Sequence, residues 1–330
     1  MRGLTLETPA DPDLRVAPPE PGTGRSRLRA AWPWLRLLIG LGIVVALVWQ
    51  LGARSFLEGL SRIDAPEVLA ALGIGAATTV LCALRWCLVA RRLGLRLPLG
   101  QAVGDYYRAL FLNAVLPAGV LGDVHRAVRH GKQEGDVGRG VRAVLLERTA
   151  GQAVIIAAAV GVLLTLPVIA PVRDIILVAL GAVALLAIAF LAARGRVRPD
   201  SRWGRAFDDV RVGLLARNAW PGVVALSAAA LAGHVALFVI AAHAAGVTAP
   251  VTQIVPLVVL SLLAMGLPVN IGGFGPREGV TALLFGAAGL GSAQGLTAAM
   301  IYGVLGLVAS LPGILMLARR TAPQKEGVTS

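Results

Sequence analysis

Two stretches of the sequence decide its fold class: Leu116–Arg126, LPAGVLGDVHR, and Leu267–Arg277, LPVNIGGFGPR. They share the pattern Leu-Pro-x4-Gly-x3-Arg at a separation of 151 positions. Proline removes a backbone donor and glycine weakens a helix, so each stretch predicts a break in helical structure. Both stretches lie inside apolar segments, which places the predicted breaks at membrane depth. Irregular backbone is tolerated there only when it is buried in protein or lines a wet cavity.

The composition of the chain is that of a polytopic membrane protein. Its 330 residues are 56% hydrophobic and 15% charged, with a mean hydropathy of +0.75, whereas soluble domains are about 25% charged. The net charge is +13, but the arginines fall between apolar runs, where the positive-inside rule expects them, so nucleic acid is not an expected partner. Cys82 and Cys87 lie in one apolar run and are expected to be packing residues, which leaves no disulfide framework.

Apolar runs of about 20 residues, the length that crosses the hydrocarbon core, predict full transmembrane helices. Six runs qualify, at residues 34–53, 67–90, 143–167, 174–193, 219–245 and 295–318. Two further apolar segments, 101–125 and 252–290, contain the Pro-Gly breaks.

Basic residues in the connections orient these segments. The connections before and after segment 101–125 are both rich in Arg and Lys, so both should be cytoplasmic. One full crossing cannot begin and end on the same side, so segment 101–125 should be a re-entrant hairpin that enters from the cytoplasm. The loop 194–217 has seven Arg and should also be cytoplasmic, whereas the connection 246–251 has no basic residue and should be external. Segment 252–290 should then enter from the outside.

The separation of 151 positions also relates two pairs of full spans. It carries 67–90 onto 218–241 and 143–167 onto 294–318. Because the two halves begin in opposite orientations, they form a predicted inverted repeat. The predicted fold is an all-α polytopic membrane protein with about six full transmembrane helices and two broken, re-entrant segments in a 4+4 inverted repeat. Its predicted divisions are a disordered cytoplasmic tail 1–31, a membrane domain 32–319 with halves 32–168 and 172–319, and a short cytoplasmic tail 320–330.

Arginine at membrane depth costs about 3 kcal/mol even on lenient insertion scales, so Arg126 and Arg277 need partners. Asp123 precedes Arg126 by three residues, and Glu278 adjoins Arg277. Two interpretations remain open. Arg126 could lie at the cytoplasmic boundary and serve topology alone. Alternatively, the N-termini of two half-helices and the two guanidiniums could form a common site for a lipid phosphate.

Several other polar residues also allow two interpretations. Arg85 lies late in the second span and could extend to the cytoplasmic interface. Glu147 and Arg148 open the predicted helix 143–167 and could pair with loop charges or line the site beside Gln152. Tyr106 could belong to an interfacial aromatic belt.

The sequence does not favour a metal, cofactor or catalytic site. The four histidines lack the spacing of metal ligands, and His234 and His243 are expected to be packing residues in the span 219–245. The Gly-x-Gly within 272–279 has no βαβ surroundings, so a dinucleotide loop is rejected. No nucleophile–histidine arrangement is apparent, and we do not expect an enzyme.

Four motifs together resemble the lysylphosphatidylglycerol synthase transmembrane-region family, a set of flippase-like membrane proteins. They are LRWCLVARRLG (84–94), LNAVLPAGVLGDVHRA (112–127), ERTAG (147–151) and GGFGPREG (272–279). The resemblance covers about 35–320, and Leu121 departs from it because the family usually has a second glycine there. It carries over as family-pattern positions Arg85, Asn113, Pro117, Gly122, Asp123, Arg126, Arg148, Gly272, Gly273, Gly275, Arg277 and Glu278. Two-domain members also carry a soluble aminoacyl-transferase domain after the membrane part, so aminoacylation of lipid is not expected from this chain alone.

The resemblance and the residues together predict a lipid flippase-like transporter in the bacterial inner or plasma membrane, with both termini cytoplasmic. Its expected substrate is an anionic lipid, either a phospholipid or a polyprenyl-phosphate-type precursor. The alternative is a membrane-embedded subunit or scaffold of a lipid- or glycan-modifying enzyme, which would act with a partner synthase. The predicted substrate-binding residues are Arg85, Asn113, Asp123, Arg126, Arg148, Asn270, Arg277 and Glu278. The predicted backbone and hinge residues are Pro117, Gly122, Pro268, Gly272, Gly273 and Gly275, although a tight helix crossing would also explain the glycines.

Overall fold

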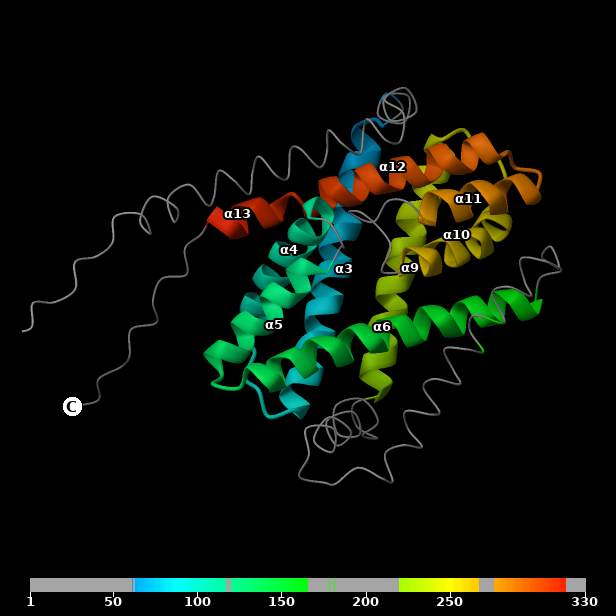
Figure 1. Cartoon of the computed structure of the whole chain (residues 1–330). Coiled ribbons are helices and arrows are strands. Elements are labelled where there is room, and N and C mark those ends of the chain that lie inside the picture. The colour runs from blue at the N-terminus through cyan, green and yellow to red at the C-terminus, as the bar shows by residue number, and fades with distance from the viewer. Residues whose placement is uncertain are drawn as a thin grey trace, which may run out of the picture.

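The computed structural model describes residues 61, 63–116, 120–165, 178, 181, 220–266 and 276–318, and these residues contain helices and connections but no strand. The predicted spans 34–53 and 174–193 lie outside this set, apart from two residues, and so do residues 117–119 and 267–275 of the two predicted breaks. The helices are α3 (Ala65–Arg92), α4 (Leu99–Val115), α5 (Leu121–Gln133), α6 (Val137–Thr165), α9 (Trp220–Ala244), α10 (Val251–Met265), α11 (Pro276–Ala287), α12 (Ser292–Ser310) and α13 (Pro312–Ala318) (Figure 1).

Four of the described helices are long and apolar enough to cross a membrane. They are Ala65–Arg92, Val137–Leu164, Trp220–Ala244 and Ser292–Leu317. The predicted span 143–167 therefore begins too late, because the helix starts at Val137. Its first turns carry Arg139 and Arg142. Hydropathy assigns such charged turns to a loop, although a helix can continue beyond the hydrocarbon layer.

The predicted broken segment 101–125 is an antiparallel helical hairpin. Helix α4 ends at Val115 and α5 begins at Leu121, on either side of Pro117. At the open end, Gln101 Nε2 donates to Gln133 Oε1 at 2.5 Å. The two ends of the hairpin therefore lie on the same side of the molecule. The second broken segment is also divided into two helices, α10 and α11, which pack against each other.

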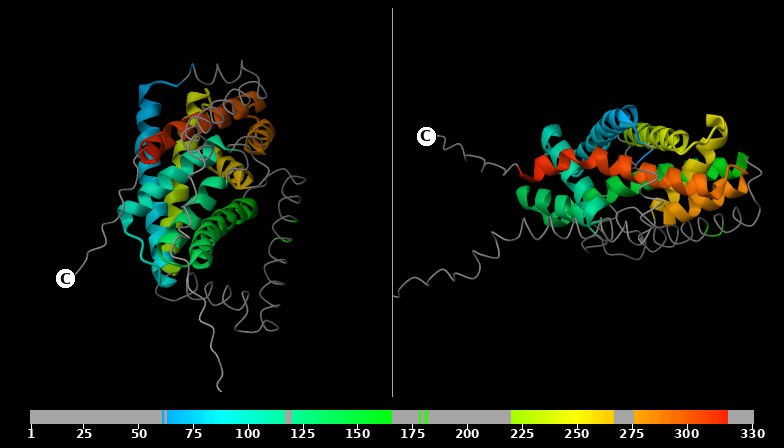
Figure 2. Two further views of the ribbon diagram at one scale, coloured as in Figure 1. Left: turned by 60° about the vertical axis from the view of Figure 1, so that its left-hand side comes forward. Right: turned by 90° about the horizontal axis from the view of Figure 1, so that it is seen from above.

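Helices α3 and α9 form an antiparallel pair at the centre of the molecule. Gly222 lies opposite Leu88, and Gly233 lies opposite Thr78. The α4–α5 hairpin lies on one side of this pair and the α10–α11 hairpin on the other (Figure 1). Helix α12 crosses the pair near the beginning of α3 (Figure 2). Helix α6 packs against the same two helices and contacts the later half of α3.

The two central helices end in the same way. Gly94 and Gly246 take φ angles of 75° and 87°, a conformation that glycine adopts without strain. In both cases the amide after the glycine donates to the carbonyl five residues earlier, at 2.9 and 3.1 Å, which is the bond of a Schellman motif. Pro98 and Pro250 then immediately precede α4 and α10.

Most of the described interior is apolar, and much of the described exterior is apolar as well. One buried cluster joins α9, α10, α11 and α12, and a second joins α3, α4 and the first half of α6. Large apolar side chains are also exposed on the outside, including Leu69 at 68%, Leu164 at 76% and Leu315 at 65%. An exterior of this kind suits contact with lipid chains.

Candidate functional site

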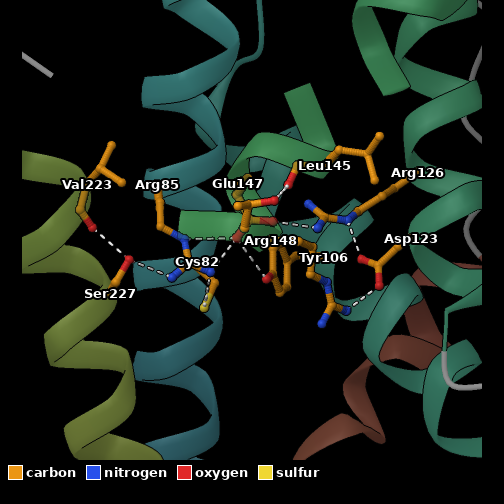
Figure 3. Close-up of polar contacts among 11 residues, drawn as sticks. Cys82, Arg85, Tyr106, Asp123, Arg126, Leu145, Glu147, Arg148, Val223 and Ser227 are labelled. Atoms are coloured by element: carbon orange, nitrogen blue, oxygen red, sulfur yellow. Dashed lines mark hydrogen bonds and ion pairs between the residues drawn. The ribbon is translucent and has the colours of Figure 1, made fainter. Parts of the chain in front are cut away.

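Glu147 on α6 lies at the centre of a buried group of polar side chains (Figure 3). Its Oε1 accepts hydrogen bonds from Arg85 Nε at 2.9 Å and Arg85 Nη2 at 2.5 Å. The hydroxyl of Tyr106 donates to the same oxygen at 3.3 Å. Oε2 accepts a hydrogen bond from Arg126 Nη2 at 2.6 Å. Helices α3, α4, α5 and α6 therefore converge on one carboxylate.

Asp123 is the second carboxylate of this group. It accepts a hydrogen bond from Arg126 Nε at 2.8 Å and from Asn113 Nδ2 at 2.9 Å, and it also pairs with Arg148 Nη2. Asn113 Oδ1 in turn accepts the Gly122 amide at 2.7 Å. The first-turn amide of α5, which we expected to be free for an anion, is thus occupied by a side chain. These seven residues are called the Glu147 cluster: Arg85, Tyr106, Asn113, Asp123, Arg126, Glu147 and Arg148.

The Glu147 cluster contains three guanidiniums and two carboxylates, and so has one formal positive charge in excess. The guanidinium of Arg126 lies between two aromatic rings, 4.7 Å from the centroid of Trp86 and 4.5 Å from that of Tyr106. Arg126 is fully buried, and its Nη1 has no hydrogen-bond partner among the described residues. The Arg148 side chain is 46% exposed, so the cluster reaches the surface through this residue.

Three of the simpler interpretations of the sequence are wrong. Arg85 does not extend to the interface, because it is only 6% exposed and its Nη1 donates to Ser227 Oγ on α9 at 2.8 Å. Tyr106 is buried and does not belong to an interfacial belt. Arg126 is fully buried and ion-paired with Asp123 and Glu147, so it does not serve topology alone. In each case the charged or hydroxyl group has a partner on another helix. The position of a residue within its own predicted span does not indicate such a partner.

A second buried polar group lies at the start of α11. Arg277 Nε donates to Glu278 Oε1 at 3.0 Å, so the predicted pairing is present. The Arg277 guanidinium lies 5.0 Å from the ring centroid of Tyr302 on α12. The Tyr302 hydroxyl is 3.1 Å from His234 Nδ1 on α9. Helix α11 begins at Pro276, and Glu278 lies in its first turn.

The structure brings together five of the predicted substrate-binding residues in the Glu147 cluster and two in the second group. Arg85, Asn113, Asp123, Arg126 and Arg148 are in the first, and Arg277 and Glu278 are in the second. The predicted hinge Gly122 packs against the Ala109 backbone, which a Cβ would overlap. The other predicted residues lie outside the described residues: Pro117, Pro268, Asn270, Gly272, Gly273 and Gly275.

The sequence left open that Glu147 lines the site, but Glu147 was not among the predicted substrate-binding residues, and neither were Tyr106, Trp86 and Ser227. Glu147 alone carried a usable signal, since an acidic residue inside an apolar run needs a partner. The other three gave no signal, because ordinary packing explains an aromatic residue or a serine in a membrane helix. Among the described residues, no group of His, Cys, Asp or Glu is arranged to hold a metal ion.

The sequence matches the family described as "Lysylphosphatidylglycerol synthase TM region" over residues 34–313. The chain belongs to this family. The resemblance of the four motifs to this family is thus confirmed, and the matched residues include both buried polar groups. No curated protein matches the sequence.

Proposed function

We propose that this protein moves a phosphate-bearing lipid, a phospholipid or a polyprenyl-phosphate-type precursor, between the two leaflets of the membrane. The Glu147 cluster is the observation that carries the proposal. Buried arginines in an apolar protein are costly unless they are paired or serve a function. Here three arginines share two carboxylates, and one side chain reaches the surface. One guanidinium also has a buried nitrogen for which the described residues offer no hydrogen-bond partner.

Arginine is the residue that best suits recognition of a phosphate. Its planar fork of donors can hold two oxygens of one phosphoryl group, and its charge does not depend on pH in the physiological range. We assign direct contact with the headgroup to Arg126 and Arg85, and entry from the surface to Arg148. Arg277 is separated from Arg126 by 151 positions, and we assign it the equivalent role in the second half, with Asn270 and the glycines 272, 273 and 275 shaping the loop before it.

An inverted repeat would supply the alternating access that lipid transfer needs. The equivalent helices α3 and α9 are antiparallel, which supports two halves of opposite orientation. A further sequence pattern, Gly-x3-Pro-x2-Gln-x-Val, begins at Gly94 and again at Gly246. Each copy connects a central helix to a hairpin, α3 to α4 and α9 to α10. We infer a 4+4 inverted repeat with six full spans and two re-entrant hairpins.

We infer that the Arg-rich connections and both termini face the cytoplasm of a bacterial cell, with the protein in its inner membrane. The connection after α3 and the connection after α5 lie at the same end of the molecule, because the Arg96 amide donates to Glu134 Oε2 at 3.0 Å. Arg91, Arg92 and Arg96 lie at or after the end of α3, and Arg129, Lys132, Arg139 and Arg142 flank the short connection 134–136 in α5 and α6. The positive-inside rule, which counts Lys and Arg near the ends of spans, assigns such basic ends to the cytoplasm.

The alternative is a membrane subunit or scaffold that supports a partner synthase. Asp123 and Glu147 each accept hydrogen bonds from arginine, so both carboxylates are already occupied as ion-pair partners. If lipid chemistry depends on this protein, a partner would therefore have to carry it out.

The test is lipid transfer in liposomes that contain the purified protein and a fluorescent phospholipid. Arg126→Lys keeps the charge but loses the fork, so transfer should fall by at least about tenfold, the change that corresponds to 1.4 kcal/mol. Arg108→Lys is the matched control, because Arg108 pairs with Asp105 in the same hairpin but outside the Glu147 cluster. Transfer at the wild-type rate by Arg126→Lys would contradict the anion site. A chemically altered lipid with unchanged leaflet distribution would indicate an enzyme, and neither change would indicate a scaffold.

A further inference from the structure

We propose that Glu147 occupies the place of the lipid phosphate in this structure, so that its carboxylate and the phosphoryl group of the substrate exchange during each transfer cycle. This inference rests on the proposed function and names a regulatory element of the same site. Glu147 holds the arginines together while lipid is absent, and it competes with lipid for them.

The surroundings of Glu147 are those of a bound oxyanion. Two oxygens accept four hydrogen bonds, two from Arg85, one from Arg126 and one from the Tyr106 hydroxyl. These donors come from three different helices, α3, α5 and α4. Convergence of arginine donors from several elements onto one anion is the arrangement that recognises a phosphate or carboxylate. Here that anion is supplied by the protein itself.

One donor of the site is left over. Arg126 Nη1 is buried, and the described residues give it no acceptor, although Nη2 of the same guanidinium reaches Glu147. A buried donor without a partner is destabilising. The two oxygens of a carboxylate lie in one plane with its carbon, whereas the oxygens around phosphorus are tetrahedral. A phosphoryl group could therefore keep the contacts to Arg85 and Arg126 Nη2 and also accept from Nη1.

The charge of the cluster also favours replacement of the Glu147 carboxylate by the phosphate over binding of the phosphate beside it. With Glu147 in place, the three arginines and two carboxylates leave one excess positive charge. Without the carboxylate of Glu147, the excess is two. A phosphate then restores the charge balance that Glu147 provided, whereas a phosphate added beside Glu147 would meet a like charge in the buried site.

The hairpin offers a matched control in Asp105. This buried carboxylate accepts hydrogen bonds from Arg108 Nη1 at 2.6 Å and Arg129 Nη1 at 2.5 Å. It is therefore a second carboxylate held by two arginines, in the same hairpin but outside the Glu147 cluster. Asp105→Asn removes the same charge as Glu147→Gln and exposes a similar pair of arginines.

The test measures ligand binding to the full chain in detergent by titration calorimetry, with thermal unfolding as a second measurement. The probes are dioctanoyl phosphatidic acid, dioctanoyl phosphatidylglycerol, inorganic phosphate and dioctanoylglycerol, which has no phosphate. Glu147→Gln should bind the two phosphate lipids at least about tenfold more tightly than the wild type. It should also unfold at a lower temperature without lipid, and lipid should restore more of its stability. Asp105→Asn should bind lipid like the wild type, and dioctanoylglycerol should give no gain.

The outcomes separate this inference from the proposed function. If wild-type protein binds and transfers lipid while Glu147→Gln binds with unchanged affinity, the exchange is wrong and the proposed function stands. If the wild type neither binds nor transfers any phosphate lipid, the proposed function itself fails. Two results would overturn the lipid phosphate as the ligand that competes with Glu147. In one, Glu147→Gln gains as much affinity for inorganic phosphate as for the phosphate lipids. In the other, Asp105→Asn gains as much affinity for lipid as Glu147→Gln does. If Glu147→Gln does not fold, Glu147→Asp keeps the charge but draws the carboxylate back, and wild-type affinity in that variant would overturn the exchange.

Discussion

Arg126 shows how a fully buried charge is accommodated in this protein. Two carboxylates accept from its guanidinium, and two aromatic rings cover it. A buried ion pair adds little net stability, but removing one partner leaves an uncompensated charge that costs about 3–5 kcal/mol. The ion pairs of the cluster are therefore not expected to be a large source of stability, which is compatible with the anion site proposed above. In that proposal the lipid phosphate replaces Glu147, and Asp123 stays paired with Arg126 and Arg148.

Residue-level contacts could be predicted only where they are local. Asp123 and Arg126 are three residues apart, and on one helix that spacing places them side by side, so their pairing followed from the sequence. Arg85 and Glu147 are 62 residues apart. Their pairing depends on the rotation of α3 and α6 about their axes, which no local pattern specifies.

Asp136 carries a prediction outside the membrane-spanning segments. Its Oδ1 accepts the Arg139 amide at 2.8 Å in the first turn of α6. That bond from the Arg139 backbone lowers the pKa of Asp136 below its usual value of 3.8. Asp136→Ala should reduce the free energy of unfolding by about 1 kcal/mol at neutral pH, and Asp136→Asn, which keeps an acceptor, by less.

The pH dependence of this cap has a definite sign. A lowered pKa in the folded state means that the ionised form stabilises the fold, so the contribution is present at neutral pH and is lost as the pH falls below 3.8. The difference in unfolding temperature between wild type and Asp136→Ala should therefore shrink in acid. A difference that stays constant from pH 7 into the acid range would show that the carboxylate charge is not involved.

At the level of the helices, the long apolar segments that lie within the described residues were predicted well, because their length and composition are sufficient signals. The spans 67–90 and 219–245 correspond to α3 (Ala65–Arg92) and α9 (Trp220–Ala244). The breaks were also predicted, since α4 and α10 end just before Pro117 and Pro268. The start of α6 was missed because its first turns are charged.

The crossing of α4 and α5 carries a steric prediction. A Cβ at Gly122 would overlap backbone atoms of Ala109, whereas a Cβ at Gly100 in the same hairpin has nothing within 4 Å. Gly122→Ala should therefore lower the free energy of unfolding by about 1–3 kcal/mol, the usual cost of overpacking. Gly100→Ala, at an exposed position in the first turn of α4, should change it by no more than about 0.5 kcal/mol. Thermal unfolding in detergent measures both, and equal stability of the two variants would contradict the close approach.

At the level of the whole molecule, the predicted separation of 151 positions needs one refinement. The patterns that begin at Gly94 and Gly246 are 152 positions apart, whereas those at Leu116 and Leu267 are 151 apart. Between these two patterns, the predicted first half therefore has one residue more than the second, in the segment that contains α4 and its counterpart α10. The packing of α3 against α9 was not predictable from the sequence, because it depends on small residues that meet across the pair, such as Gly233 opposite Thr78.

The orientation of the molecule in the membrane gives the last prediction. Lys132 lies at the end of the α4–α5 hairpin, next to the connection after α3, and Thr248 lies in the connection after α9. Because α3 and α9 are antiparallel, these connections lie at opposite ends of the central pair. With Cys82 and Cys87 replaced, Lys132→Cys should react with an impermeant maleimide only after the cells are lysed. Thr248→Cys should react in intact cells.

Lysed cells provide the control, since both cysteines must react there if the variants are folded with these exposed positions accessible. External labelling at position 132, or of Arg205→Cys in the Arg-rich loop 194–217, would contradict the proposed orientation. Labelling of positions 132 and 248 from the same side would be more serious. The antiparallel α3 and α9 would then not both cross the membrane, and an inverted repeat with alternating access could not be built from them.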